Sequence, residues 1–218
     1  MHRLASGAGE CPGANSHSIG FSMLIWINSP QARSREFLFL DRDGVINEDR
    51  PDFITCWQHV RFYPDALDAL RWLKEQGVQV ILISNQSGLN RGIVHWESFW
   101  EIHHRMMEAI RRAGGEILAA FYCPHRPDER CECRKPRPGL ILEASRIYGI
   151  PPNTCSMIGD RTTDLEAASQ AGCRGILLDR DSGAVSSPGV FRLGGGDGAL
   201  CYPTLYEAVS DLWRAEWA

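Results

Sequence analysis

The sequence predicts an α/β fold in which a mostly parallel sheet is covered by helices on both faces. Short apolar runs, typical of buried strands, alternate along the 218 residues with segments whose apolar residues recur at helical spacing. Several of these runs also end in acidic or polar side chains, which is where open parallel sheets bind their ligands. Right-handed crossovers between successive strands would make the sheet parallel.

Buried strands are expected at residues 37–40, 78–83, 117–122, 156–158 and 175–178. Helices are expected at residues 64–76, 95–113, 138–148, 164–171 and 204–213. In the first helix, Pro64 suits the first turn and Gly77 suits the position just past the end. The polar residues 48–59 and the glycine- and serine-rich residues 181–198 are expected to form loops.

Residues 1–35 differ from the rest and are expected to form a disordered or extended tail. The first twenty residues are rich in glycine, serine and alanine and lack periodicity. A signal peptide is disfavoured because the basic region is poor and the apolar run at residues 21–27 is short, and Met23 is an alternative start. Residues 36–218 are expected to form one domain of ordinary α/β size.

Composition argues against several classes of partner. The net charge of −4 disfavours nucleic acid and membrane surfaces, and no apolar run approaches the ~20 residues that span a bilayer. Of the eight cysteines, three cluster with a histidine, while most of the others are scattered, several within apolar segments, as buried free thiols are. The cysteine pattern therefore predicts a reducing compartment, and we expect the cytoplasm. We also expect a monomer that acts on a small molecule.

Polar residues follow the ends of the expected strands and precede one helix. They are Asp41 and Asp43, Ser84 and Asn85, Lys135, and Asp160 with Asp164. Because the carboxyl ends of parallel strands share one edge of the sheet, these side chains can converge. Carboxylates that converge repel one another, and a divalent cation is the usual remedy. Oxygen ligands beside a phosphate substrate favour Mg²⁺.

This edge predicts phosphoryl transfer to a carboxylate. Asp41 would attack phosphorus, and Asp43 would protonate the leaving alkoxide and then activate the hydrolytic water. Mg²⁺ would be held by Asp41, Asp160 and the main-chain carbonyl of Asp43. Lys135 and Ser84 would bind the phosphoryl oxygens.

Each of these features also has an ordinary structural explanation. Asp41-x-Asp43-Gly44 could be a surface turn, as could Ser84-Asn85. Asp164 is favourable at a helix start, and Lys135 could be a solvated lysine. Their joint occurrence at strand ends favours the functional interpretation.

A second group of ligand-type residues lies between the third strand and the third helix. Cys123, His125, Cys131 and Cys133 form a Cys₃His set, a common tetrahedral zinc site. A redox pair and a chance cluster are the alternatives. Because protein would fill all four positions, the Zn²⁺ would be structural and would brace the loop that carries Lys135.

The strand-end motifs resemble the haloacid dehalogenase superfamily of phosphotransferases. The resemblance spans residues 37 to about 180 and rests on the motifs Asp41-Arg42-Asp43-Gly44, Ser84-Asn85, Lys135 and Gly159-Asp160-x-x-x-Asp164. It implies a Rossmann-like sheet and an aspartyl-phosphate intermediate. The chain has no room for a separate cap domain after Asp43 or Ser84, so the entrance should be open.

The cysteine cluster narrows the resemblance. Residues 121–125 and 131–139, together with residues 84–92, are similar to the D-glycero-D-manno-heptose 1,7-bisphosphate phosphatases, which remove the 7-phosphate in making activated heptose for surface polysaccharide. The histidinol-phosphate phosphatases share the same skeleton. This chain departs from the pattern in its short zinc loop, which leaves anomer preference open, and in its long N-terminal tail.

The resemblance also implies a set of substrate contacts. Arg134 would recognise the sugar phosphate, and Arg161 would lie beside the substrate. The loop from Asp49 to Asp52 would line the entrance. Further contacts would come from Asn85, Gln86 and Arg91.

These observations leave three hypotheses. They are a heptose bisphosphate phosphatase, a histidinol-phosphate phosphatase, and a non-catalytic zinc-bearing interaction protein on the same scaffold. The intact Asp41, Asp43, Lys135 and Asp160 argue against the third.

Overall fold

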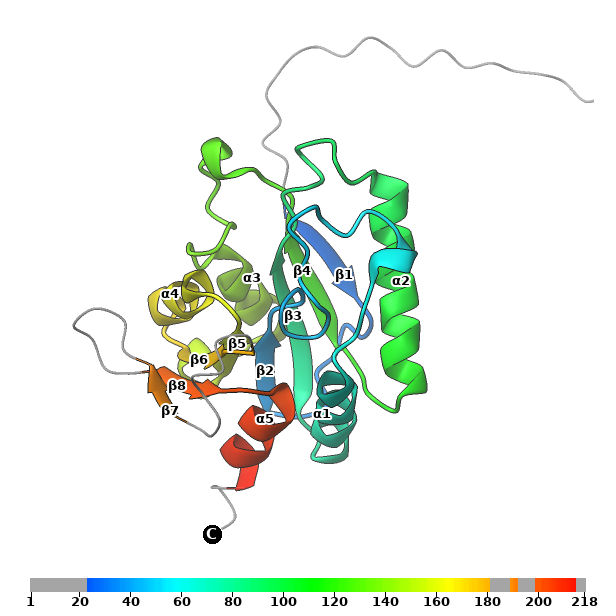
Figure 1. Ribbon diagram of the computed structural model, residues 1–218. Coiled ribbons are helices and arrows are strands. Elements are labelled where there is room, and N and C mark those ends of the chain that lie inside the picture. The colour runs from blue at the N-terminus through cyan, green and yellow to red at the C-terminus, as the bar shows by residue number, and fades with distance from the viewer. Residues whose placement is uncertain (1–22, 181–188, 192–198, 215–218) are drawn as a thin grey trace, which may run out of the picture.

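The computed structural model describes residues 23–180, 189–191 and 199–214 (Figure 1). Its described strands form one sheet in the order β1-β4-β3-β2-β5-β6-β8-β7. The strands are β1 Leu24–Ile27, β2 Phe37–Leu40, β3 Gln79–Asn85, β4 Ala119–Cys123, β5 Ser156–Gly159, β6 Arg174–Leu178, β7 Gly189–Phe191 and β8 Ala199–Tyr202. All neighbours pair in parallel except β1 with β4 and β7 with β8. The expected α/β class with a mostly parallel sheet is confirmed.

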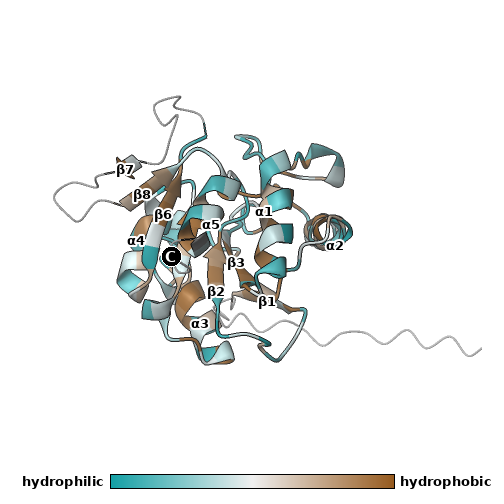
Figure 2. Ribbon diagram, turned by 90° about the horizontal axis from the view of Figure 1, so that it is seen from below, coloured by the Kyte–Doolittle hydropathy of each residue, from teal (hydrophilic) through white to brown (hydrophobic). Residues whose placement is uncertain are grey.

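Five helices in the described part of the chain cover the two faces of the sheet. They are α1 Pro64–Glu75, α2 Trp96–Arg112, α3 Gly139–Tyr148, α4 Thr162–Ala171 and α5 Leu205–Arg214. Helices α3 and α4 lie on one side, and α1 and α2 on the other with α5 (Figures 1 and 2). As expected, Pro64 opens α1, and Gly77 beyond its end has a φ of 76°.

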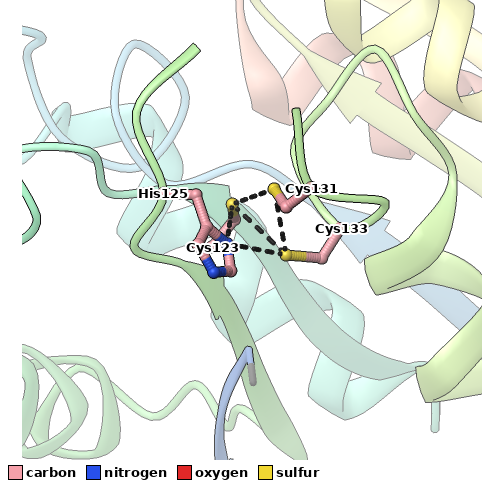
Figure 3. A group of neighbouring side chains, drawn as sticks. All are labelled: Cys123, His125, Cys131 and Cys133. Carbon is pink, nitrogen blue, oxygen red and sulfur yellow. Dashed lines mark hydrogen bonds between the residues drawn. The ribbon is translucent and has the colours of Figure 1, made fainter. Parts of the chain in front are cut away.

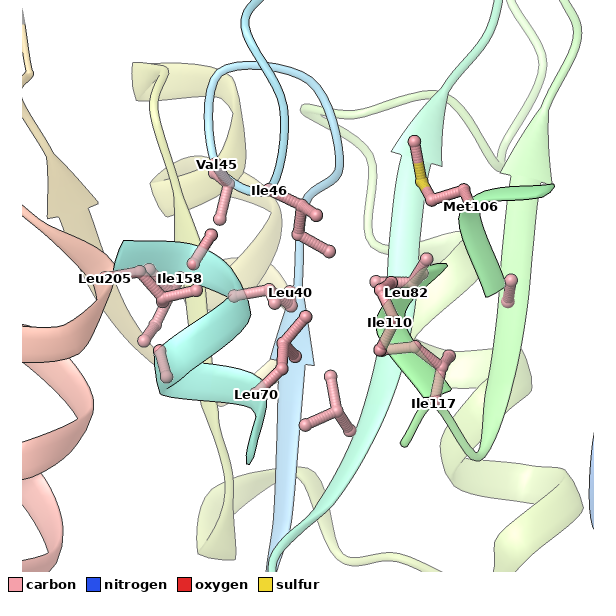
Figure 4. Close-up of a cluster of buried hydrophobic side chains, with 14 of the residues drawn as sticks. Leu40, Val45, Ile46, Leu70, Leu82, Met106, Ile110, Ile117, Ile158 and Leu205 are labelled. Atoms are coloured by element: carbon pink, nitrogen blue, oxygen red, sulfur yellow. The ribbon is translucent and has the colours of Figure 1, made fainter. Parts of the chain in front are cut away.

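The sheet separates two apolar layers. Leu40 of β2 and Leu82 of β3 face α1 and α2, in the cluster that Figure 4 shows with Leu70 and Met106. The alternate residues, such as Phe39, face α3 and α4. Side chains of a strand alternate between its two faces, so neighbouring residues of β2 and β3 enter different layers.

The N-terminal edge strand β1 lies within the segment that we expected to be a tail. Its residues pair with β4, and Leu24 and Trp26 pack against the core cluster on the α2 side. Ile25 and Ile27 face outward and are 36% and 43% exposed. Four residues with only two inward side chains carry too weak a pattern for sequence alone. Residues 1–22 of the expected tail lie outside the described residues.

The strands nearest the C-terminus also differ from the elements expected from the sequence. Within the expected loop at residues 181–198, residues 189–191 form β7, and the other positions lie outside the described residues. The strand β8, which was not expected, pairs in parallel with β6 and brings Cys201 and Tyr202 into buried positions.

No separate cap domain occurs among the described residues, as expected. The segments that follow β2 and β3 hold only loops and the short 3₁₀ turn Trp57–His59 before the next helix begins. Nor does any described helix have the length and apolar character needed to cross a bilayer.

Candidate active site

The carboxyl ends of the central strands open into a cavity of about 450 Å³. Ten of the predicted site residues line it. They are Asp41, Asp43, Asp49, Ser84, Asn85, Gln86, Arg134, Lys135, Arg161 and Asp164. Asp160 lines an adjoining cavity together with Asp49 and Arg161. Asp52 and Arg91 line neither cavity, so the structure does not bring them into the site.

Lys135 is clamped between two carboxylates at the floor of the cavity. Its Nζ lies 2.8 Å from Asp41 Oδ2 and 2.5 Å from Asp164 Oδ1, and it donates a hydrogen bond of 2.9 Å to the main-chain oxygen of Ile83. Burial opposes the charge on Lys135, but the two carboxylates outweigh it and raise the pKa of its ammonium group. A permanent positive charge therefore sits beside Asp41.

Asp41 directly follows β2 and is 7% exposed. Burial, opposed by Lys135 and reinforced by Asp164, raises the pKa of its carboxyl to about 6. Asp41 Oδ1 accepts a hydrogen bond from the main-chain nitrogen of Arg42. Oδ2 faces Lys135, so the carboxylate is held in one orientation at the cavity floor.

The side chain of Asn85 holds the Lys135 segment. Its Nδ2 donates to the main-chain oxygen of Lys135, and its Oδ1 accepts from the main-chain nitrogen of Lys135, both at 3.1 Å. Both polar ends of Asn85 are thus used within the protein. This geometry gives Asn85 a positioning role, and the expected substrate contact stays a prediction.

Three carboxylates at this edge form a group suited to a cation. Oxygens of Asp41, Asp160 and Asp164 lie within 4.8 Å of one another, and Asp160 Oδ1 is buried without a hydrogen-bond partner among the described residues. Burial, followed by the charges of Asp41 and Asp164, raises the pKa of Asp160 to about 7. An all-oxygen set with an unsatisfied buried carboxylate oxygen fits Mg²⁺.

Asp43 and Asp164 have different roles at this edge of the sheet. The carboxylate of Asp43 lies outside the cation group, which leaves its main-chain carbonyl as the expected ligand. Asp164 is committed to Lys135 through Oδ1, and its Oδ2 accepts from the main-chain nitrogen of Arg161. Asp164 therefore serves both as the partner of Lys135 and as the N-terminal acidic residue of α4.

Gly44 is required by the position of Asp160. Its φ is 78°, and a Cβ at this position would lie 2.1 Å from Asp160 Oδ2. We expect Gly44→Ala to displace Asp160, to weaken Mg²⁺ binding by about 10-fold or more, and to lower turnover accordingly. Titration of activity against Mg²⁺ measures the shift.

Gly77→Ala is the matched control for Gly44→Ala. Gly77 has a φ of 76°, but a Cβ there would meet nothing within 4 Å. Gly77→Ala therefore introduces the same backbone strain as Gly44→Ala, but its Cβ does not collide with another residue. Equal Mg²⁺ requirements in the two variants would contradict the role assigned to Gly44.

Mg²⁺ is expected to raise the melting temperature more at about pH 8 than at about pH 5.5. The metal-free folded carboxyls have pKa values of about 6 for Asp41 and about 7 for Asp160, above their ordinary value of 3.8. The folded state therefore binds more protons than the unfolded state, so stability without metal falls as the pH rises through this window. Mg²⁺ binds the ionised carboxylates and offsets that loss.

Thermal unfolding with Mg²⁺ or with a chelator at both pH values tests this expectation. Asp160→Asn is the control, because it cannot ionise and should lose most of the pH-dependent increment. A Mg²⁺ effect of equal size at both pH values would count against the site.

The Cys₃His cluster is assembled as the sequence predicted (Figure 3). Cys133 Sγ lies 3.4 Å from Cys123 Sγ and 3.5 Å from Cys131 Sγ, and the Nδ1 of His125 lies 3.2 Å from Cys133 Sγ. The edge of a tetrahedron with Zn–S bonds of about 2.3 Å is about 3.8 Å, close to these spacings. The donor set and its convergence fit a structural Zn²⁺.

The zinc loop connects the cluster to the entrance of the cavity. Arg134 directly follows Cys133, and its guanidinium donates to the main-chain oxygen of His125 at 3.2 Å. Asn90, from the loop after β3, donates to Glu129 of the zinc loop at 2.9 Å. Folding of the cluster therefore sets the position of Arg134 and of the neighbouring Lys135.

Ion pairs hold the opposite wall of the entrance. Arg161 pairs with Asp49, which links the start of α4 to the loop after β2. Arg50, within the loop that was expected to line the entrance, lines the cavity and pairs with Asp52 at 2.7 Å. Arg91 is exposed on the loop after β3, outside the cavity.

The fold and the site define a hydrolase of the haloacid dehalogenase-like class, and a family model described as HAD-hydrolase-like matches residues 132–187. The chain is 37% identical over 150 residues to the D-glycero-beta-D-manno-heptose-1,7-bisphosphate 7-phosphatase of Pseudomonas aeruginosa, covering 69% of this chain and 84% of that protein. The corresponding enzyme of Bordetella bronchiseptica is 38% identical over 148 residues, covering 68% of this chain and 83% of that protein.

Structural comparison agrees with the sequence comparison. The D,D-heptose 1,7-bisphosphate phosphatase of B. bronchiseptica, crystallised with magnesium and phosphate, aligns with a TM-score of 0.74 and 34% identity, covering 83% of this chain and 99% of that one. The chain therefore belongs to the D-glycero-D-manno-heptose-1,7-bisphosphate 7-phosphatase family.

Proposed function

We propose that this protein is a Mg²⁺-dependent phosphatase that removes the 7-phosphate of D-glycero-D-manno-heptose 1,7-bisphosphate through an aspartyl-phosphate. The observation that carries the proposal is the convergence of Asp41, Lys135 and Asp160 at one sheet edge, in a chain of this family. The product would enter the synthesis of ADP- or GDP-heptose for surface polysaccharide.

In the first step, a carboxylate oxygen of Asp41 attacks phosphorus while the ester P–O bond breaks. Because Asp43 is ionised beside Arg42, the phosphate monoester would bind as its monoanion and pass its proton to Asp43, which delivers it to the leaving alkoxide. Lys135 and Ser84 bind the phosphoryl oxygens. In the second step, water attacks the acyl-phosphate and gives its proton to Asp43. The P–O bond to Asp41 then breaks, which frees inorganic phosphate and restores the carboxylate.

The metal site supports this chemistry through charge. Asp41, Asp160 and the main-chain carbonyl of Asp43 would hold Mg²⁺, which when bound offsets the negative charge of carboxylate and phosphate. The raised pKa values of Asp41 and Asp160 follow from burial and mutual repulsion, which such a cation relieves.

The entrance supports a sugar phosphate as substrate. No cap covers the described site, and the cationic side chains of Arg50, Arg134 and Arg161 line the cavity above Lys135. Arginine is well suited to bind a phosphate through two parallel hydrogen bonds. None of the described cysteines forms a disulfide, which supports a reducing, cytoplasmic location, and we propose a monomer.

A substrate panel tests the proposal. We expect the α or the β anomer of heptose 1,7-bisphosphate to have the highest kcat/KM, and histidinol phosphate to have a value at least about 100-fold lower. The assay measures phosphate release with Mg²⁺ and with chelator. A preference for histidinol phosphate would overturn the substrate assignment while leaving the phosphatase class intact.

A further inference from the structure

Arg42, between the two aspartates of the motif, is buried and points to the opposite face of the sheet from Asp41. Asp41 contacts Lys135, while the charge of Arg42 acts on His103 and on Tyr122, which belongs to the apolar cluster on the α2 side. The side chain of Arg42 is 3% exposed. A guanidinium at this depth needs a counter-charge and a full set of acceptors.

That counter-charge is Asp43. Arg42 Nε lies 3.0 Å from Asp43 Oδ1, and Arg42 Nη2 lies 2.8 Å from Oδ1 and 2.7 Å from Oδ2. Asn47 Nδ2 donates to the same Oδ1 at 2.8 Å. The carboxylate of Asp43 is therefore held by several donors and cannot rotate freely in the cavity.

Gln86 forms hydrogen bonds with both members of the Arg42–Asp43 ion pair. Its Nε2 donates to Asp43 Oδ2 at 2.8 Å and to Ser84 Oγ at 3.2 Å, and its Oε1 accepts from Arg42 Nη2 at 3.1 Å. Both ends of the Gln86 amide are used inside the protein. These contacts give Gln86 a role within the protein that the resemblance to the family did not indicate.

The side chains around Arg42 on the α2 side carry no negative charge that could compete with Asp43. On the α2 side the Tyr122 hydroxyl and His103 Nδ1 lie 2.9 Å apart and are hydrogen-bonded, and both residues are fully buried. Burial, assisted by neighbouring charges that include Arg42, lowers the pKa of His103 to about 3, so this pair is neutral. Among the described residues, Asp43 forms the sole ion pair of Arg42.

We propose that Arg42 and Gln86 are positioning residues that hold the carboxylate of Asp43 in the orientation for proton transfer and do not bind the substrate. The proposal rests on the proposed function, in which Asp43 exchanges a proton with the leaving group and with water. It assigns the loop after β2 and the loop after β3 a shared task, because Gln86 reaches Asp43 across the cavity floor.

Gln86→Leu is the direct test, because it keeps the side-chain size and removes every hydrogen bond to Asp43, Ser84 and Arg42. Positioned proton transfer contributes ~10²–10⁴-fold to rates, so partial loss of orientation should lower kcat for the sugar phosphate by about 10–100-fold. KM should stay within about 2-fold, because no substrate contact is lost. Gln76→Leu, an exposed position beyond α1, is the control and should match the wild type.

The leaving group provides a second readout that a structural defect would not reproduce. Nitrophenolate leaves without a proton, so the first-turnover rate of p-nitrophenyl phosphate cleavage by Gln86→Leu should fall less than about 3-fold. Equal losses with both substrates, or a raised KM at unchanged kcat, would overturn the proposal.

Arg42→Lys adds a variant with the same charge and a different geometry. Lysine cannot form the two-pronged contact, so kcat should fall as in Gln86→Leu while the protein stays folded by circular dichroism. Full activity in both variants would refute the positioning role. If the wild type itself releases no phosphate from either substrate, the proposed function fails, and that outcome is distinct from failure of this inference.

Discussion

Asp41→Asn is expected to reduce phosphate release by at least about 10⁴-fold, because the amide cannot attack phosphorus. The rest of the site should survive, since Lys135 keeps its ion pair with Asp164. The raised pKa of Asp41 means that the folded environment favours the neutral form, so asparagine should not lower stability near neutral pH. Steady-state phosphate release and thermal unfolding measure the two effects.

Asp68→Asn is the control for Asp41→Asn, because Asp68 lies on the exposed side of α1 and pairs with Arg71. In the wild type, rapid acid quench followed by mass spectrometry should locate a phosphoryl group on Asp41 and nowhere else. Retention of Mg²⁺-dependent activity by Asp41→Asn would refute the nucleophile assignment. It would also reopen the non-catalytic hypothesis for the scaffold.

Loss of a zinc ligand is expected to have the largest effect on stability. Cys133→Ser should abolish Zn²⁺ retention and lower the free energy of unfolding by about 3 kcal/mol or more, because metal binding energy is folding energy. For a domain of this size that corresponds to a melting temperature about 6–12 °C lower. Activity should fall as well, since Arg134 and Lys135 directly follow Cys133.

Metal analysis and thermal unfolding test the zinc expectation together. The wild type should contain about one Zn²⁺ per chain, and a strong zinc chelator should reproduce the effect of Cys133→Ser. Cys56→Ser is the control, because Cys56 is a free thiol outside the cluster. Zinc-free protein that unfolds at the wild-type temperature would contradict a structural role for the cluster.

Much of the candidate site was predictable because its signals are local. Asp41 and Asp160 each directly follow a buried apolar strand, and a parallel sheet brings such positions to one edge whatever the loops do. The zinc ligands were equally easy to predict, because four ligand-type residues fall within one short segment. In both cases neighbouring residues in sequence carry the pattern.

The roles within the site were harder to predict because they depend on contacts between distant segments. The side chain of Asn85 binds the main chain of Lys135, 50 positions further along the chain, a contact that the sequence did not indicate. Gln86 likewise reaches Asp43, 43 positions earlier. Sequence similarity marks such residues as important without indicating which partner they have.

The surroundings of Asp43, the residue proposed to transfer protons, could not be predicted from the sequence either. The motif correctly places Asp43 beside the cavity. Burial alone would raise the pKa of Asp43, but the charge and hydrogen bonds of Arg42 outweigh it and hold this pKa below its ordinary value. Nothing in the order of Asp41, Arg42 and Asp43 shows that the arginine would be buried and turned toward its neighbour.

By itself the sequence determined the fold class, the order of the central elements, the acidic edge and the zinc cluster, because apolar periodicity and ligand spacing are local properties. Only the tertiary structure decided that residues 24–27 close the sheet on β4, that Lys135 sits between Asp41 and Asp164, and that Arg42 turns toward Asp43. Those arrangements depend on which distant segments share a buried face. The free energy of packing and of burying charges selects these arrangements, and no short stretch of sequence specifies that free energy.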